Sequence, residues 1–297
     1  MYCLNQTTFK RDGVRFTFPC GKCLACCAKK QREWIFRIGE ELKANNGSAS
    51  FVTLTYEDSN LKLHKGVPVL EKPELQKFLK RLRRFCEPNK IRYFAIGEYG
   101  DIFQRPHYHL IIFNFDVNEE NYRLLKKSWN KGFVSISNVN PNRISYVTKY
   151  MFKFLREPNE DFPEFRLSSK NPGLGLQYVQ DPAVQHWHLT SLRTYIVQPG
   201  GYQIPLPRYF KEKLFSKPYR ELANQRAMDE YFERNAIELQ EILRSEDAEK
   251  INEYMLRDKE EYARQQHIIE KFKYKQQLKK EMYHEYIQFK QSEKVKN

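Results

Sequence analysis

The chain has 297 residues, long enough to bury a substantial core in one or two domains. It carries 51 lysines and arginines against 37 aspartates and glutamates, and this formal net charge of +14 suggests a polyanionic partner such as nucleic acid. No apolar run approaches the ~20 residues that cross a bilayer, and no GxxxxGK[ST] phosphate loop is present, so we expect neither a membrane protein nor an NTP-driven motor.

The N-terminal segment is rich in cysteine and has no apolar signal-peptide stretch, so we expect a reducing cytoplasm and thiols or metal ligands rather than disulfides. A CxxC spacing suits a zinc knuckle, but a second spaced pair is missing, and Cys3 with Cys26 or Cys27 would have to replace it. Two interpretations stay open. One is structural zinc on Cys3, Cys20, Cys23 and Cys26, and the other is a group of buried or surface thiols.

Helical and strand patterns alternate along the first half of the chain. We expect helices over 28–43, 72–85, 120–130 and 141–155, and strands over 50–56, 91–100, 107–116 and 132–139. The strands at 91–100 and 107–116 are joined by a short loop with Gly100 and Pro106. Strands separated by helices, with one hairpin among them, indicate an α+β fold with a mainly antiparallel sheet.

The predicted helix 72–85 is strongly basic. It could track DNA phosphates, although the same charges are found on an ordinary solvated helix face. The candidate DNA-binding residues are Lys77, Lys80, Arg81 and Arg84 of this helix, together with Arg105.

The second half of the chain changes character. Residues 157–207 are rich in proline and glycine and are predicted to be irregular. From residue 208 onward the composition favours a weakly amphipathic, charged helix. We therefore expect one domain over 1–207 and a charged helical tail over 208–297. The tail could bind DNA, recruit a host factor or be an exposed extension.

Two histidines open the apolar run RPHYHLIIF. In a strand, His107 and His109 share a face, and an antiparallel hairpin would bring Glu98 to the same end. One carboxylate and two imidazoles can bind a divalent ion, either magnesium or manganese, that acts as a Lewis acid. The alternatives are hydrogen-bonded core imidazoles or a chance pair on a surface edge.

The predicted helix 141–155 carries four polar residues on one face, with an apolar stripe on the other. The polar residues are Tyr146, Lys149, Tyr150 and Lys153. A phenol has an unperturbed pKa of about 10, so it attacks poorly at neutral pH unless a nearby cation favours the phenolate. The alternative is an amphipathic helix with tyrosine and lysine at its solvated edge.

The ordered set FVTLTY, GEYG…RPHYHLIIF and YVTKYMFK resembles the three motifs of the HUH endonucleases that initiate rolling-circle replication. The similarity covers most of residues 19–215 and is closest to the replication initiators of gokushovirus-like microviruses, with PCGKCLACC, EFRLSSKNPGLG and PLPRYF as further matching segments. It implies an HUH/RRM-like five-stranded sheet flanked by helices, with a C-terminal charged helical extension.

The resemblance also implies a chemistry. Glu98, His107 and His109 would be the metal ligands, Tyr146 and Tyr150 the nucleophiles, and Lys149 and Lys153 assisting residues. Such a protein nicks an origin strand, forms a 5′-phosphotyrosyl link and later rejoins the displaced strand. It acts on single-stranded or origin DNA in a bacterial host cytoplasm, with a host helicase and polymerase as partners.

Two other functions stay open. A non-catalytic module could bind single-stranded nucleic acid with its sheet and its basic helix. A metal-dependent hydrolase could use water as the nucleophile instead of tyrosine.

Overall fold

The structure is a computed structural model, and it describes Cys3, residues 5–11, 14–100, 104–149, Phe152, 161–244 and most positions from 249 to 281. The chain forms two compact units. We call residues 34–175 with 269–297 the sheet unit, and residues 1–33 with 176–268 the helical unit. This division does not follow the boundary we expected at residue 207, because the N-terminal 33 residues fall in the same unit as most of the C-terminal segment.

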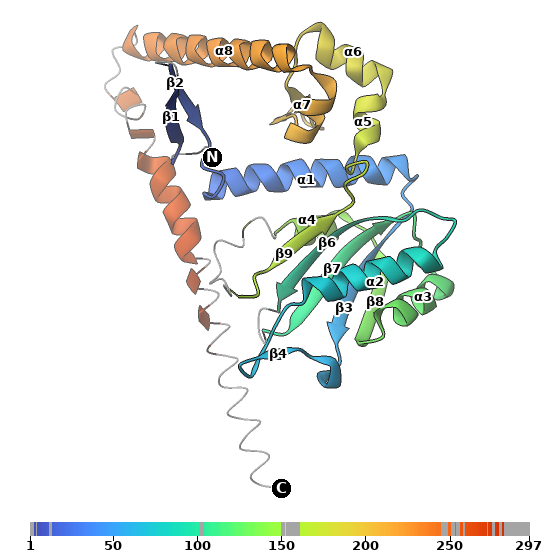
Figure 1. Cartoon of the computed structure of the whole chain (residues 1–297). Coiled ribbons are helices and arrows are strands. Elements are labelled where there is room, and N and C mark those ends of the chain that lie inside the picture. Colours follow the sequence, from blue (N-terminus) through green and yellow to red (C-terminus); the bar gives the residue numbers. More distant parts are fainter. Residues whose placement is uncertain are drawn as a thin grey trace. The chain divides into compact units, whose positions relative to one another are not determined.

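The sheet unit is built on a five-stranded antiparallel sheet (Figure 1). Its strands, in order across the sheet, are β8 (Gly132–Asn138), β3 (Ala49–Tyr56), β7 (Pro106–Phe113), β6 (Arg92–Tyr99) and β9 (Phe165–Ser168). Every neighbouring pair is antiparallel. The predicted α+β fold with a five-stranded sheet is thereby confirmed.

One face of the sheet carries the main apolar core. The helices α2 (Lys72–Phe85) and α3 (Glu119–Trp129) cover this face, as Figure 1 shows. The apolar residues of α2 recur at helical spacing and pack against alternate residues of the strands. The core includes Leu54, Leu110 and Ile112 from the sheet and Phe78 and Trp129 from the helices.

The opposite face of the sheet packs against other helices, α1 (Leu24–Ala44) and α4 (Pro141–Thr148). Trp34 of α1 meets Phe94 of β6 with ring centroids 4.9 Å apart. A buried ion pair between Glu41 of α1 and Arg92 of β6 adds a polar tie, and the backbone N–H of Gly175 donates to the same carboxylate at 2.7 Å. We call this side the histidine face, because His107 and His109 point to it.

Smaller elements complete the sheet unit. They are the 3-10 helix η1 (Asp58–Asn60) and the short hairpin of β4 (Leu63–His64) and β5 (Val67–Pro68).

The helical unit has its own apolar contacts. Its elements are the hairpin β1 (Thr7–Arg11) and β2 (Val14–Phe18), the start of α1, α5 (Leu176–Gln180), α6 (Pro182–Thr190), the hairpin β10 (Tyr195–Val197) and β11 (Gln203–Pro205), α7 (Arg208–Leu214) and α8 (Lys217–Arg244). Tyr178 stacks on Phe210 with centroids 5.3 Å apart, and its hydroxyl bonds to the buried His188 at 3.0 Å.

Most of the predicted elements are confirmed, including the helix at 72–85 with both of its ends. The prediction of irregular chain over 157–207 was wrong, because these residues supply the edge strand β9 and the helices α5 and α6. The helical character of the C-terminal segment is confirmed by α7, α8 and further helical positions up to residue 281. Within the described residues, no helix has both the length and the apolar character needed to cross a membrane.

Candidate active site on the histidine face

Strand register places the predicted metal ligands at one end of the histidine face. Glu98 of β6 lies directly opposite His107 of β7, and Ile96 lies opposite His109. Because partners across an antiparallel ladder share a face, the carboxylate and both imidazoles point to the same side. His109 Nε2 lies 3.3 Å from Glu98 Oε1, and the His107 and His109 ring centroids are 6.2 Å apart.

Both imidazoles are held by threonines of the neighbouring strand β3. Thr53 Oγ1 lies 3.0 Å from His109 Nδ1, and Thr55 Oγ1 lies 3.3 Å from His107 Nδ1. Each hydroxyl occupies one ring nitrogen and leaves the Nε2 atom for another partner. Sequence reasoning missed this role of Thr53 and Thr55, although their alternation in FVTLTY is a readable signal that one strand lines the site.

Gly100 leaves room for the ring of His107. A Cβ atom at position 100 would lie 2.9 Å from His107 Nε2, too close for an ordinary contact. Burial lowers the pKa of His107, and the neighbouring His109 lowers it further. Both effects favour the neutral imidazole, which is the form that binds metals.

Helix α4 brings a tyrosine onto this group. Its N-cap is Asn140, whose side chain accepts from the Arg143 N–H at 2.9 Å, and Pro141 fits the first turn. The Tyr146 hydroxyl donates to Glu98 Oε1 and lies 3.5 Å from His109 Nε2. Ile144 and Val147 are buried, whereas 39% of Tyr146 stays exposed. One phenol is therefore accessible and in contact with the carboxylate and one imidazole.

The other members of the predicted nucleophile face are only partly described. Lys149 is exposed, with its Nζ 5.9 Å from the centroid of the Tyr146 ring. Tyr150 and Lys153 lie outside the described residues.

Tyr108, between the two histidines, points to the opposite face. Its buried hydroxyl lies 2.8 Å from that of Tyr56 and donates to the Glu71 carbonyl at 3.0 Å. Burial raises the pKa of the Tyr108 phenol to about 12. This tyrosine is therefore part of the core and not a candidate nucleophile.

The predicted DNA-binding residues lie away from this site or are engaged within the protein. Helix α2 packs on the opposite face of the sheet from His107 and His109. Arg81 donates to the Ser128 carbonyl at 2.7 Å, and Lys77 lies 3.4 Å from Glu74. Arg105 pairs with Asp58 at 2.6 Å. Lys80 and Arg84 are exposed, so they remain the better candidates of this set.

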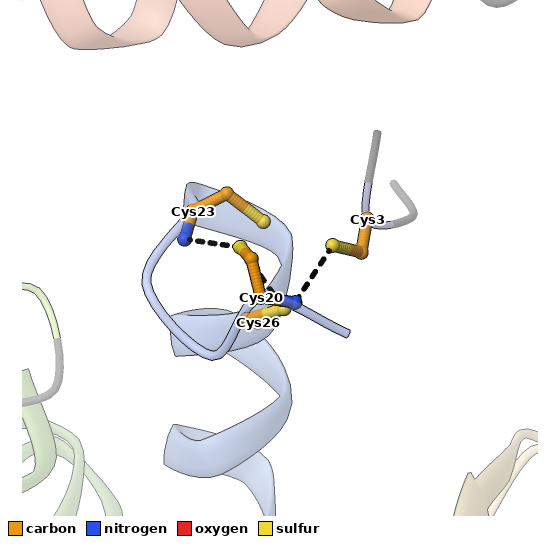
Figure 2. A group of neighbouring side chains, drawn as sticks. All are labelled: Cys3, Cys20, Cys23 and Cys26. Atoms are coloured by element: carbon orange, nitrogen blue, oxygen red, sulfur yellow. Dashed lines mark hydrogen bonds between the residues drawn. The ribbon is translucent and has the colours of Figure 1, made fainter. Parts of the chain in front are cut away.

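The four cysteines named as possible zinc ligands come together in the helical unit. The sulfur atoms of Cys3, Cys20, Cys23 and Cys26 all lie within 4.8 Å of one another (Figure 2). Cys27 is buried beside this group and its thiol donates to the Lys22 carbonyl instead. Of the two partners considered for Cys3, the structure therefore places Cys26 in the group.

Comparison with known proteins points to replication. A family described as replication-associated protein ORF2 matches residues 49–155, which span the three motifs. The replication-associated protein VP4 of Bdellovibrio phage phiMH2K is 30% identical over 225 residues, covering 68% of this chain and 69% of that protein.

Two further relatives agree. The replication-associated protein ORF2 of Spiroplasma virus 4 is 28% identical, covering 72% of this chain and 71% of that protein. The replication-associated protein ORF4 of Chlamydia phage 1 is 26% identical, covering 70% of this chain and 57% of that protein. No solved structure matches the chain.

Proposed function

Because the chain belongs to the family of microvirus replication-associated proteins, we propose that it initiates rolling-circle replication by nicking one DNA strand with a tyrosine. The Tyr146 oxygen forms a bond to phosphorus while the bond from phosphorus to the 3′ oxygen breaks. The products are a 5′-phosphotyrosyl link and a 3′-OH that primes a polymerase. The link conserves the phosphodiester free energy, so rejoining needs no ATP.

One observation carries this proposal. The hydroxyl of an exposed tyrosine contacts both a carboxylate and an imidazole of the Glu98, His107 and His109 group. A structural tyrosine on a solvated helix edge would not need to point into a polar group on the sheet. The contact joins the second and third sequence motifs in space, which is what a phosphoryl-transfer site requires.

The donor set fits a divalent metal, since it offers one carboxylate oxygen and two imidazole nitrogens whose Nδ1 atoms are already bonded to threonines. Glu98, His107 and His109 would hold the ion, magnesium or manganese, which supplies Lewis-acid polarisation of the scissile phosphate.

The surrounding side chains assist the phenol. Its proton leaves along the hydrogen bond to Glu98, which is its acceptor in the structure. The positive charge of Lys149 stabilises the developing phenolate. We assign Tyr150 as the second nucleophile, which cuts the regenerated origin after one round, and Lys153 as its assisting residue.

The proposal implies partners. The chain contains no phosphate loop, so a host helicase would separate the strands and a host polymerase would extend the 3′-OH. Single-stranded DNA at the origin is the substrate, and the host cytoplasm is the proposed place of action.

The double variant Tyr146→Phe with Tyr150→Phe tests the nucleophile. Single-stranded oligonucleotides that tile the encoding genome are incubated with the protein and Mn²⁺ or Mg²⁺, and covalent adducts are read on a denaturing gel. We expect an adduct with the wild-type chain and none with the double variant. Tyr202→Phe, which changes a tyrosine that is 73% exposed in the helical unit, should keep the adduct.

The same assay separates the other candidate functions. A water-using hydrolase would cut the oligonucleotide without an adduct, and the double variant would still cut. A non-catalytic binding module would retard the oligonucleotide on a native gel, with or without a chelator, and never cleave it. Either result would overturn the proposal.

A further inference from the structure

The segment before α1 forms a tight turn around the Cys20 sulfur. Gly21 has a φ of +72°, a left-handed conformation that glycine adopts without strain. This turn aims two backbone N–H groups at one atom. The N–H of Lys22 lies 3.4 Å, and that of Cys23 3.3 Å, from Cys20 Sγ. Such N–H···S bonds stabilise a thiolate, and the thiolate is the form that binds metal.

The other sulfurs reach the same point from two directions. Helix α1 opens where the Cys27 N–H donates to the Cys23 carbonyl at 3.0 Å, so Cys26 lies in the first helical turn. Cys3 approaches from the N-terminal segment, and its sulfur accepts the Cys20 N–H at 3.3 Å. Figure 2 shows the four side chains converging, three from the turn and helix start and one from the separate segment.

We propose that Cys3, Cys20, Cys23 and Cys26 bind one zinc ion as a closed structural site. Tetrahedral zinc with Zn–S bonds of about 2.3 Å holds its sulfurs about 3.8 Å apart. The four sulfurs lie within 4.8 Å of one another, and those of Cys20 and Cys26 are 4.0 Å apart. A disulfide would need about 2.05 Å, and all six cysteines are free in the structure.

The composition of the group separates it from the nicking site. Within the described residues, no other set of three or more histidine, cysteine or acidic side chains gathers as closely. Four thiolates select zinc over magnesium, whereas Glu98, His107 and His109 offer oxygen and nitrogen. A site with four protein ligands has no open position, so its role is to stabilise the fold and not to catalyse a reaction.

The fold explains what the ion would stabilise. The hairpin of β1 and β2 lies between Cys3 and Cys20 in the chain. An isolated two-stranded hairpin is marginally stable in water. A metal that binds before and after it would fix both of its ends to the start of α1, and part of the binding free energy would appear as folding free energy.

Metal content of the untagged, full-length protein tests the site. Mass spectrometry of the purified chain should find one zinc per chain. Zinc should be lost in Cys26→Ser and retained in the double variant His107→Ala with His109→Ala. Retention in the histidine variant keeps this test independent of the nicking proposal.

Matched cysteine controls sharpen the assignment. Cys27→Ala changes a neighbour outside the group and Cys86→Ala a thiol of the sheet unit, and both should keep full zinc. If Cys26→Ser fails to fold, wild-type protein refolded with Co²⁺ gives a second measurement, since cobalt bound by four thiolates shows intense charge-transfer and visible bands. Zinc-free protein with titratable thiols, a Cys20–Cys26 disulfide, or zinc that survives Cys26→Ser would each overturn the proposal.

Discussion

At the scale of single residues, the two imidazoles of the histidine face owe their orientation to β3. Thr53 and Thr55 lie directly opposite His109 and His107, so each hydroxyl meets the Nδ1 atom of the histidine it faces. An Nδ1–H that donates to threonine leaves the Nε2 lone pair for a metal. The strand thereby sets the tautomer as well as the position of each ring.

Replacing Thr53 by valine keeps the shape of the side chain and removes the hydroxyl. We expect Mn²⁺ binding to weaken about 10–100-fold, the usual effect of losing a residue that orients a metal ligand. Titration calorimetry on the zinc-loaded protein measures this change. Ser50→Ala is the control, because Ser50 belongs to the same strand but points to the opposite face, where its buried hydroxyl has no partner. Equal affinity in wild type and Thr53→Val would show that the hydroxyl does not orient His109.

At the scale of elements, the junction of β8 with β3 depends on one glycine. Gly132 begins β8 with a φ of +149°, opposite Tyr56. A Cβ atom at this position would collide with backbone atoms of Thr55 and Glu57. Backbone cannot move aside as a flexible side chain can, so the strand end would have to shift, and Thr55 with it.

Gly132→Ala should therefore lower the free energy of unfolding by about 1–3 kcal/mol or more, through strain and displaced backbone. Gly39→Ala is the matched control, since a Cβ there meets nothing within 4 Å in the middle of α1. That change should stabilise by about 0.5–1 kcal/mol, because alanine favours a helix over glycine. Urea unfolding of both variants measures the two effects, and a neutral Gly132→Ala would contradict the described junction.

Elements also show how far the sequence alone could lead. Long periodic segments such as 72–85 were predicted correctly because many residues repeat the same signal. The short strand β9 was missed, since FRLS has too few residues to show alternation among its prolines and glycines. Glu98 could be placed near His107 from hairpin geometry, whereas the contact of Tyr146 with Glu98 depends on how α4 packs, which no local pattern encodes.

At the scale of the whole molecule, the excess positive charge is spread over surfaces that do different work. The exposed Lys80 and Arg84 lie on α2, on the opposite face of the sheet from the candidate active site. DNA held by α2 would thus contact the protein away from the scissile phosphate. Their contribution should be to affinity and not to the chemical step.

Binding of a single-stranded oligonucleotide should depend steeply on salt. With a net charge of +14, we expect the affinity to fall at least about tenfold between about 50 and 200 mM salt, as condensed counterions are released. The double variant Lys80→Ala with Arg84→Ala should reduce the slope of log K against log salt by about 1, since each lost phosphate contact removes about 0.7. Fluorescence anisotropy measures the slope. An unchanged slope would remove α2 from the DNA-binding surface.

The pairing of β3, β6 and β7 limits how members of this family can diverge. Adding one residue inside Pro106–Phe113 would exchange the two sides of the strand, turning His107 and His109 inward and Tyr108 outward. Adding a residue in the connection between β6 and β7 leaves both strands unaltered. Evolution can therefore lengthen or shorten such connections freely, while insertions and deletions within these strands are excluded by selection.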